Sequence, residues 1–508
     1  MDSLVKDPQY FPQVAVSTPV NVDWIAGITH SNVQQAVNAL LGDCYGHTSA
    51  SDKHVDQNDD LALFKVLNDV LPTMSSRTRR LWMRVARPFA QMLHISQMSL
   101  STQCTFLVFL YARVFGFLGP EKGSDPPACL TLDGSPIEFS WIIPNKKVAK
   151  GKPNRNLRCV MEPFDPRGSG SPLRGSSVLK YFSSYAGSLG GVVRCDWDGL
   201  LWVESTEGFF FPQELKSDYV QDGGRFAMGF DFTHSGIITL KAYFLSFEHP
   251  PWVGSPETFK TKSPLCIGDT ELSPLRDFAG QIHPSFAKSC DMIIDHMHSL
   301  ETKERPVYEF ASMDCKSPGS NRLKLYTRSL ARTNFSAIKE DFTLGGRIHT
   351  PELEGALLVL EKLWNSVFPD FSSAIDKPLE VADTGEDDNG HPQGGLPYHY
   401  EFAIGDAMLY PKVYIPVRFY STNDLETSRR IEKFYDSVGI EGPEGGEQGP
   451  GWVEREVAKC FEHRTDLDKR TGCRTYLSFG LRKGGWEVTS YFSPELFSSG
   501  HTEIELRA

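Results

Sequence analysis

The sequence lacks the features that mark several common classes of protein. Its ten cysteines include no Cys-x-x-Cys pair and follow no metal-binding spacing. No apolar stretch reaches the ~20 residues of a membrane-spanning helix, because Arg113 interrupts the most apolar run, 106–118. The net charge of −12 argues against a nucleic-acid binder, which needs a basic face. We therefore expect a cytoplasmic protein with reduced cysteines and with no nucleic-acid or membrane partner, in which 106–118 is a buried helix.

Motifs that hold phosphate groups are absent as well. The sequence contains no Asp-Asp-x-x-Asp motif for Mg²⁺, and its adjacent aspartates, Asp59-Asp60 and Asp387-Asp388, lie in polar, loop-like segments. It also lacks the Gly-x-x-x-x-Gly-Lys-Ser/Thr motif of phosphate-binding loops. A diphosphate ligand would therefore have to be bound directly by Arg and Lys side chains, without a metal ion.

The sequence does contain a repeated pattern of secondary structure, in which two helices and a β-hairpin recur about five times. Helices are predicted at 61–71, 78–117, 177–189, 274–300, 335–342, 352–368, 423–438 and 453–463. The strands of each hairpin are joined by turns that contain Gly or Pro, which makes them antiparallel. These strands are predicted at 137–143 and 157–162, 225–232 and 237–247, 309–314 and 322–327, 398–404 and 412–419, and 474–481 and 486–492.

Ten antiparallel strands can close into one barrel with the helices outside. The predicted fold class is therefore α/β, a ten-stranded antiparallel β-barrel ringed by α-helices and built from repeated ααββ units in a single domain. We assign residues 1–30, which are Pro-rich and aperiodic, to a partly loose N-terminal extension and residues 31–508 to the barrel. Surface excursions are predicted at 145–156, 250–264, 376–397 and 439–451.

Basic residues and tyrosines occupy alternate positions in several predicted strands. Because side chains alternate between the two faces of a strand, Arg322, Lys324 and Tyr326 share one face and the intervening leucines share the other. Further members of this pattern are Lys241 with Tyr243, Lys412 with Tyr414, Tyr476 and Tyr491. A solvated edge strand would also carry such charges, but their recurrence in three hairpins favours a cationic, tyrosine-lined barrel interior suited to an anion and a carbocation.

Glu138 is a candidate base because of its surroundings. It follows an Asp-Gly-Ser-Pro turn and is flanked by apolar residues. If its side chain points into the barrel, burial raises the pKa of the carboxyl group and makes it a usable base. From its residue context alone, Glu138 is one of 64 acidic residues, and a structural salt bridge is the favoured role.

Eight short motifs, in this order along residues 60–495, carry a family resemblance. They are Ile-Glu-Phe-Ser (137–140), Arg-Cys-Val-Met-Glu-Pro (158–163), Gly-Phe-Asp-Phe (229–232) before Leu-Lys-Ala-Tyr-Phe, Asp314 before Arg-Leu-Lys-Leu-Tyr (322–326), Thr-Leu-Gly-Gly-Arg (343–347), Pro-Lys-Val-Tyr-Ile-Pro-Val (411–417), Thr-Tyr-Leu-Ser-Phe (475–479) and Tyr-Phe-Ser-Pro (491–494). As a set they resemble the fungal aromatic prenyltransferases of the dimethylallyltryptophan synthase type. The resemblance implies the same ten-stranded barrel.

The resemblance also implies roles for individual residues. It makes Glu138 the catalytic base. The diphosphate-binding residues that it implies are Arg158, for which Arg155 is an alternative, Lys241, Arg322, Lys324, Lys412 and Arg482. The implied tyrosine shield is Tyr243, Tyr326, Tyr414, Tyr476 and Tyr491. No cofactor is implied, since the prenyl diphosphate is a co-substrate and Mg²⁺ is not required.

Two positions depart from the tryptophan-specific members of that family. Ala227 stands where those members carry a lysine, and Glu309 stands where they carry an arginine for the carboxylate of the amino acid. We place both residues, with Leu130, in the acceptor pocket. These departures predict an acceptor without a carboxylate, such as an indole alkaloid or a phenolic, polyketide-like molecule.

The expected function is the transfer of a dimethylallyl or longer prenyl group from an allyl diphosphate to such an acceptor. The reaction would be a Friedel–Crafts-type electrophilic substitution in fungal secondary metabolism, carried out by a monomer or homodimer. Two alternatives stay open: O- or N-prenylation with a longer prenyl donor, and a non-catalytic barrel that carries aromatic ligands.

Overall fold

The structure is a computed structural model that describes most of the chain. Described are residues 59–71, 75–119, 128–145, 155–165, 173–184, 192–195, 206–207, 225–245, 273–371, 378–379, 395–442 and 449–501, with a few single-residue gaps, and Val33, Gln35 and Val37. The predicted extension 1–30 and the centres of the predicted excursions, 146–154, 250–264, 380–394 and 443–448, lie outside the described residues.

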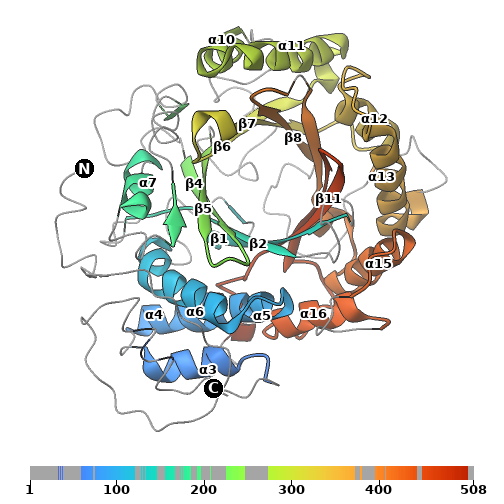
Figure 1. Cartoon of the computed structure of the whole chain (residues 1–508). Helices are drawn as coiled ribbons and strands as arrows, with labels where there is room; N and C mark the ends of the chain where they lie inside the picture. Colours follow the sequence, from blue (N-terminus) through green and yellow to red (C-terminus); the bar gives the residue numbers. More distant parts are fainter. Residues whose placement is uncertain are drawn as a thin grey trace.

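Ten antiparallel strands close into a barrel (Figure 1). They are β1 (Ile137–Pro144), β2 (Asn156–Met161), β4 (Arg225–Phe232), β5 (Ile238–Leu245), β6 (Val307–Asp314), β7 (Arg322–Ser329), β8 (Leu396–Ala403), β9 (Tyr410–Ile415), β10 (Arg474–Arg482) and β11 (Gly485–Phe492). Hairpin neighbours pair in chain order, β2 pairs with β4, and the ring is closed by β5 with β6 and by β1 with β11. A two-residue strand, β3 (Val193–Arg194), adds to β5 in parallel. The predicted barrel is confirmed.

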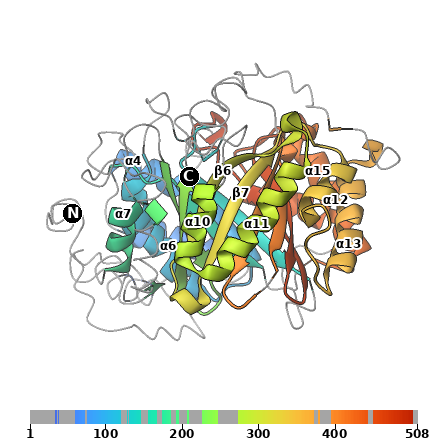
Figure 2. The ribbon, with the colours of Figure 1, turned by 90° about the horizontal axis from the view of Figure 1, so that it is seen from above.

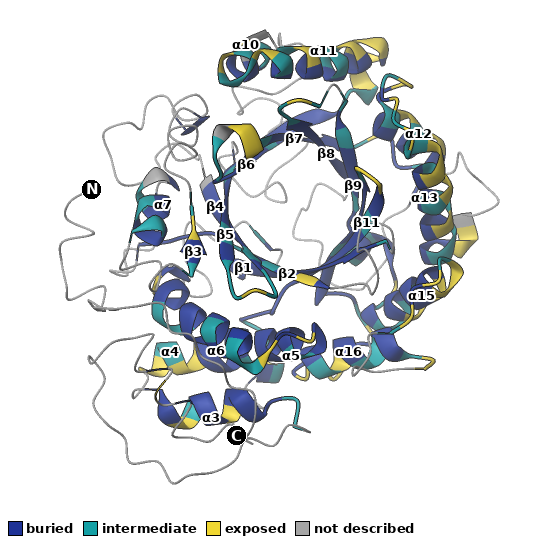
Figure 3. Cartoon of the chain, in the orientation of Figure 1, coloured by how far each residue is buried: buried dark blue, intermediate teal, exposed yellow. Residues whose placement is uncertain are grey.

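Helices form a ring around this barrel, and their buried faces are turned toward it (Figure 3). The longer ones are α3 (Ala62–Val70), α4 (Ser76–Leu81), α5 (Arg87–Ile95), α6 (Leu100–Phe109), α7 (Gly175–Ser183), α10 (Ser273–Ile282), α11 (Pro284–Ser299), α12 (Phe335–Thr343), α13 (Leu353–Val367), α15 (Asp424–Ser437) and α16 (Trp452–Cys460). Figure 2 shows α10 and α11 alongside β6 and β7. The hydrophobic core therefore lies between the strands and the helices rather than inside the barrel.

The outward face of β4 shows how this core is built. Phe230 and Phe232 point away from the barrel toward α5 and α6, where the ring of Phe109 lies 5.3 Å from that of Phe230. The rings of Phe89 and Phe106 lie 4.9 and 4.8 Å from that of Phe232. Burial of large aromatic side chains is a strong stabilising contribution. It leaves the other face of the same strand to line the interior of the barrel.

The apolar stretch noted in the sequence belongs to this outer layer. The helical segment Leu100–Phe117 is long and apolar enough to cross a membrane by length and composition alone, but 67% of it is buried inside the protein. It comprises α6, the π-helical turn η2 (Leu110–Val114) and the 3₁₀ turn η3 (Phe115–Phe117). The prediction of a buried helix at 106–118 is confirmed for this segment.

The helix predicted at 78–117 is interrupted in the structure. Helix α5 ends at Ile95, and Ser99 caps the next helix, α6, by accepting a hydrogen bond from the Thr102 amide.

Two further predicted elements differ from the structure, both at prolines. The strand predicted at 412–419 ends at Ile415, and Val417–Tyr420 form the short helix α14, because Pro416 has no N–H to continue the ladder. The helix predicted at 274–300 is two helices separated at His283. Pro284 is the first residue of α11, where its missing N–H costs nothing, and the His283 side chain accepts a hydrogen bond from the Ser285 amide.

Candidate active site

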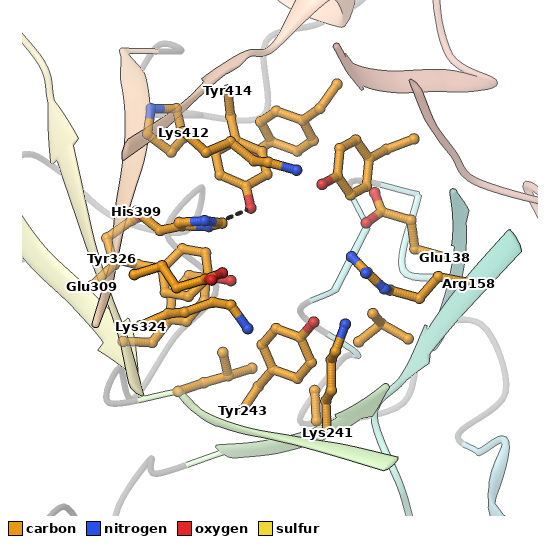
Figure 4. Close-up of a pocket in the computed structure, with 18 of the residues that line it drawn as sticks. Glu138, Arg158, Lys241, Tyr243, Glu309, Lys324, Tyr326, His399, Lys412 and Tyr414 are labelled. Carbon is orange, nitrogen blue, oxygen red and sulfur yellow. Dashed lines mark hydrogen bonds between the residues drawn. The ribbon is translucent and has the colours of Figure 1, made fainter. Parts of the chain in front are cut away.

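The interior of the barrel contains a cavity of about 220 Å³, and all ten strands contribute to its wall. Figure 4 shows labelled side chains from different strands pointing toward a common central space. Every candidate site residue named from the sequence lines this cavity, including Leu130, Ala227 and Glu309, with the exception of Arg155, the alternative to Arg158. The inward rows of strands far apart in the sequence thus meet in one place.

One end of the cavity is lined by six basic side chains that share four carboxylates. Asp231 of β4 pairs with Arg158 and, at 2.5 Å, with Lys241. Asp314 of β6 lies 2.5 Å from Arg322 Nη2 and 3.3 Å from Lys324 Nζ. The cation cluster is our name for these six residues together with Glu401, Lys412, Arg482 and Glu487.

The remaining members of the cation cluster come from β8 to β11. Glu401 accepts a hydrogen bond of 3.0 Å from Arg322 and lies 3.5 Å from Arg482. Glu487 pairs with Lys412 at 2.7 Å and with Arg482 at 2.6 Å. Six basic groups against four carboxylates (6 − 4 = 2) leave two basic groups in excess. This end of the cavity therefore favours an anion.

The pKa values within the cation cluster follow from burial and proximity. Burial, together with the neighbouring Arg158, lowers the pKa of Lys241 to about 7. Burial alone would raise the pKa of Asp231, but Arg158 and Lys241 outweigh it and hold that pKa well below its usual value. Asp314 is held well below its usual pKa in the same way by Lys324 and Arg322. The carboxylates are thus ionised, and an arriving anion would complete the charge balance and favour the protonated form of Lys241.

Next to the cation cluster, aromatic rings surround the cavity. The ring of Tyr326 lies 6.5 Å from Tyr243 and 6.1 Å from Tyr414, and Tyr414 lies 5.6 Å from Tyr491 and 6.3 Å from Tyr476. We call these five residues the tyrosine ring. Such a band of π-faces stabilises a cation and displaces water.

Two further aromatic residues extend the tyrosine ring. Phe310 stacks on Tyr326 with a centroid distance of 4.0 Å. His399 lies 2.9 Å from the Tyr414 hydroxyl through Nδ1, and burial with the nearby Lys412 keeps its pKa well below the usual value, so that it is neutral. Both side chains hold tyrosines in place without adding charge.

Glu138 of β1 is a buried carboxyl group that accepts no hydrogen bond from a basic side chain among the described residues. Its Oε1 accepts a hydrogen bond of 2.6 Å from the Thr475 hydroxyl. Burial raises its pKa to about 8, and the hydrogen bond from Thr475 opposes that rise only in part. A pKa near the operating pH is suited to proton transfer. A positive charge developing beside Glu138 would favour its ionised form.

Glu309 and Arg328 form a buried ion pair elsewhere on the cavity wall. Arg328 Nε donates to Glu309 Oε1 at 2.6 Å, and Nη2 donates to Oε2 at 3.4 Å. The register of β6 and β7 shifts between Tyr308 and Phe310, so Glu309 is the extra residue of a β-bulge. That bulge explains why Glu309 and its neighbour Phe310 both line the cavity.

Comparison with known proteins agrees with this geometry. The model of the family described as tryptophan dimethylallyltransferase matches residues 78–446. The chain belongs to this family. It is an aromatic prenyltransferase.

Individual relatives are distant but match along almost their whole length. A 7-dimethylallyltryptophan synthase of Aspergillus fumigatus is 23% identical over 91% of this chain and 97% of its own length. Xanthone prenyltransferase B of Emericella nidulans is 27% identical over 86% of this chain and 92% of its own length. The crystal structure of NotF in complex with brevianamide F and DMSPP shares the fold, with a TM-score of 0.63 at 21% identity over 85% of this chain and 98% of that one.

The structure distinguishes Arg155 from Arg158, the two arginines that the sequence offered as alternative diphosphate ligands. Arg155 lies outside the barrel, where it pairs with Glu456 of α16 at 2.7 Å and packs over the rings of Trp141 and Trp452. Arg158 lines the cavity. Of the two, Arg158 is therefore the one placed to contact a ligand of this prenyltransferase.

Four polar cavity residues were missed by the sequence analysis: His399, Glu401, Glu487 and Arg328. Each lies in an inward row in which alternate residues face the cavity. Arg328 extends the row that contains Lys324 and Tyr326, and Glu487 precedes Tyr491 by four residues. Strict alternation could have found these side chains, but it would have placed Glu309 outside, because only the bulge brings it in.

Close packing around Lys412 generates a prediction. A Cβ atom at Gly480 would lie 2.7 Å from Cε of Lys412. Gly480→Ala should therefore shift the Lys412 ammonium group away from Glu487 and weaken the binding of inorganic pyrophosphate about tenfold, the value of one charge-assisted hydrogen bond. The measurement is titration calorimetry. Gly355→Ala in α13, where a Cβ meets nothing within 4 Å, is the control. An unchanged affinity in Gly480→Ala would show that the position of Lys412 does not matter for the anion.

Proposed function

We propose that this enzyme transfers a prenyl group from an allyl diphosphate to a neutral, electron-rich aromatic acceptor without a metal ion. One observation carries the proposal. A single cavity places a cation cluster, a ring of five tyrosines and a buried carboxyl group of raised pKa along one path. These are the groups that a leaving diphosphate, an allyl cation and a departing proton each require.

The cation cluster would bind the diphosphate and stabilise it as the leaving group. Because the basic side chains come from five different strands of a closed barrel, their positions are fixed before the ligand arrives. The carboxylates that could otherwise attract Mg²⁺ are already paired with Arg or Lys. This arrangement supports direct binding of the diphosphate by the protein.

The chemical steps would then use the cation cluster, the tyrosine ring and Glu138 in turn. The allylic C–O bond breaks with its electron pair going to the diphosphate, and the π-faces of the tyrosine ring stabilise the resulting allyl cation. The aromatic acceptor, held in contact, supplies the electron pair for the new bond to carbon. Glu138 takes up the proton that the substituted ring, or an attacking hydroxyl or N–H group, releases.

The acceptor end of the cavity supports an uncharged acceptor. Its walls include the apolar side chains of Leu130, Val160, Ala227 and Leu245. Relatives are named for tryptophan and xanthone substrates, and NotF was crystallised with brevianamide F, so aromatic acceptors within the family vary widely. We propose an indole alkaloid or a phenolic, polyketide-like molecule for this enzyme.

A transfer assay tests the proposed function. The enzyme is incubated with dimethylallyl, geranyl or farnesyl diphosphate and a panel of neutral indoles, phenols and tricyclic aromatics, and products are read by mass spectrometry. We expect at least one acceptor to gain the mass of a prenyl group with loss of one hydrogen. The absence of product with every pair, in an enzyme that binds both ligands, would favour a non-catalytic carrier.

Turnover should persist in excess EDTA, since basic side chains hold the diphosphate. The comparison is between initial rates with EDTA and with added Mg²⁺, using the best acceptor of the assay above. Modest stimulation by Mg²⁺ is compatible with direct binding. Complete loss of activity in EDTA that Mg²⁺ restores would contradict it.

Glu138→Gln keeps the size of the side chain and removes its basicity. We expect turnover to fall by about 10²-fold or more, as is usual for a positioned acid–base group, with pyrophosphate affinity unchanged. In wild type, kcat/KM for the acceptor at saturating donor should rise with pH, reach half its maximum near pH 8 and level off above about pH 9, because the pKa of Glu138 is raised to about 8 and only its ionised form accepts a proton. The variant should lose this pH dependence. Near-wild-type turnover would assign the proton to another group.

A further inference from the structure

Arg328 is a basic residue in a different part of the cavity from the cation cluster. It is the last inward residue of the β7 row and lies four residues beyond Lys324. At about 3.4 Å per residue, the two Cα positions are about 13 Å apart along the strand. Arg328 is 8% exposed and lines the cavity. By itself it would attract an anion to the acceptor end.

Glu309 cancels that charge. The β-bulge places its carboxylate against the guanidinium group with contacts of 2.6 and 3.4 Å, and Glu309 is 3% exposed. Arg328 also contacts the Tyr476 hydroxyl, which ties the pair to the tyrosine ring. A charge-assisted pair of this geometry is strong and offers no net charge to a ligand.

We propose that Glu309 masks an anion-binding site on Arg328, so that the enzyme selects aromatic acceptors without a carboxylate. This inference rests on the proposed transfer to an aromatic acceptor and names the basis of its selectivity. A carboxylate entering this end has to displace Glu309 or remain as an uncompensated buried charge. Specificity therefore comes from an element that disfavours the wrong ligand. The charge of Glu309 is one half of a neutral pair and not an unpaired repulsive charge.

The masking predicts the effect of Glu309→Gln, which keeps the shape of the side chain and exposes the charge of Arg328. The probes are indolepropionate and indolepropionamide, which differ by one negative charge. Their dissociation constants are measured by calorimetry with inorganic pyrophosphate bound, and their kcat/KM values with dimethylallyl diphosphate. We expect wild type to prefer the amide by at least tenfold. Glu309→Gln should raise the affinity for the carboxylate relative to that for the amide by ten- to a hundredfold, about the range for one buried charge.

The double variant Glu309→Gln with Arg328→Gln is the matched control. It should lose the gained affinity for the carboxylate, because the exposed guanidinium group is the cause of that gain. An amide-to-carboxylate ratio that is the same in wild type and in Glu309→Gln overturns the masking. If Glu309→Gln does not fold, the wild-type ratio decides, and a preference of wild type for the carboxylate overturns the proposal.

The dissociation constants and the rates of prenyl transfer test masking and the proposed function separately. Binding that discriminates as expected, without prenyl transfer to any acceptor, supports masking and contradicts the enzymatic role of the site. Prenyl transfer with an unchanged ratio contradicts masking and leaves the enzymatic role intact.

Discussion

The structure depends on the compensation of charge inside a closed barrel. Six basic side chains would repel one another strongly at low dielectric, and burying them unpaired would cost far more than a domain's net stability. The four carboxylates of the cation cluster hold them together, and each is shared between two basic residues. This compensation lowers the cost of burying the basic side chains. Because it is incomplete, the cation cluster still favours an anionic ligand.

Such an interior is possible because the hydrophobic core lies elsewhere. In a strand, one face can be buried against helices while the other faces the cavity. Phe230 and Phe232 serve the outer core while Asp231, between them, anchors two cations inside. The same division on β8 places Tyr398 and Tyr400 outside and His399 and Glu401 inside. The helices therefore provide the stability that a charged interior cannot.

The barrel could be predicted from the sequence because inward-facing and outward-facing residues alternate regularly along the strands. The rows Lys241 with Tyr243 and Arg322 with Lys324 and Tyr326 predicted both the strands and the face that is turned inward. Features that depend on strand register could not be predicted from the sequence. The bulge that turns Glu309 inward and the pairing of Glu309 with Arg328 arise from strand alignment, which no local pattern encodes. Proline positions explained two of the remaining errors, since Pro416 and Pro284 ended elements that periodicity alone would have continued. In the predicted helix 78–117, the cap residue Ser99 begins a new helix.

Two glutamates in the same cavity illustrate how environment decides the role of a residue. Glu138 receives a hydrogen bond from a neutral hydroxyl, and burial raises its pKa to about 8, so it can exchange a proton during a reaction near neutral pH. Glu309 faces a guanidinium group, and its charge is balanced by that partner rather than by a proton. Exchanging these surroundings would exchange the roles, because the side chains are chemically identical. The chemistry of the site is thus determined by which side chain each carboxyl group meets. For Glu309 that partner is on the neighbouring strand β7, and for Glu138 it is on β10, which does not pair with β1.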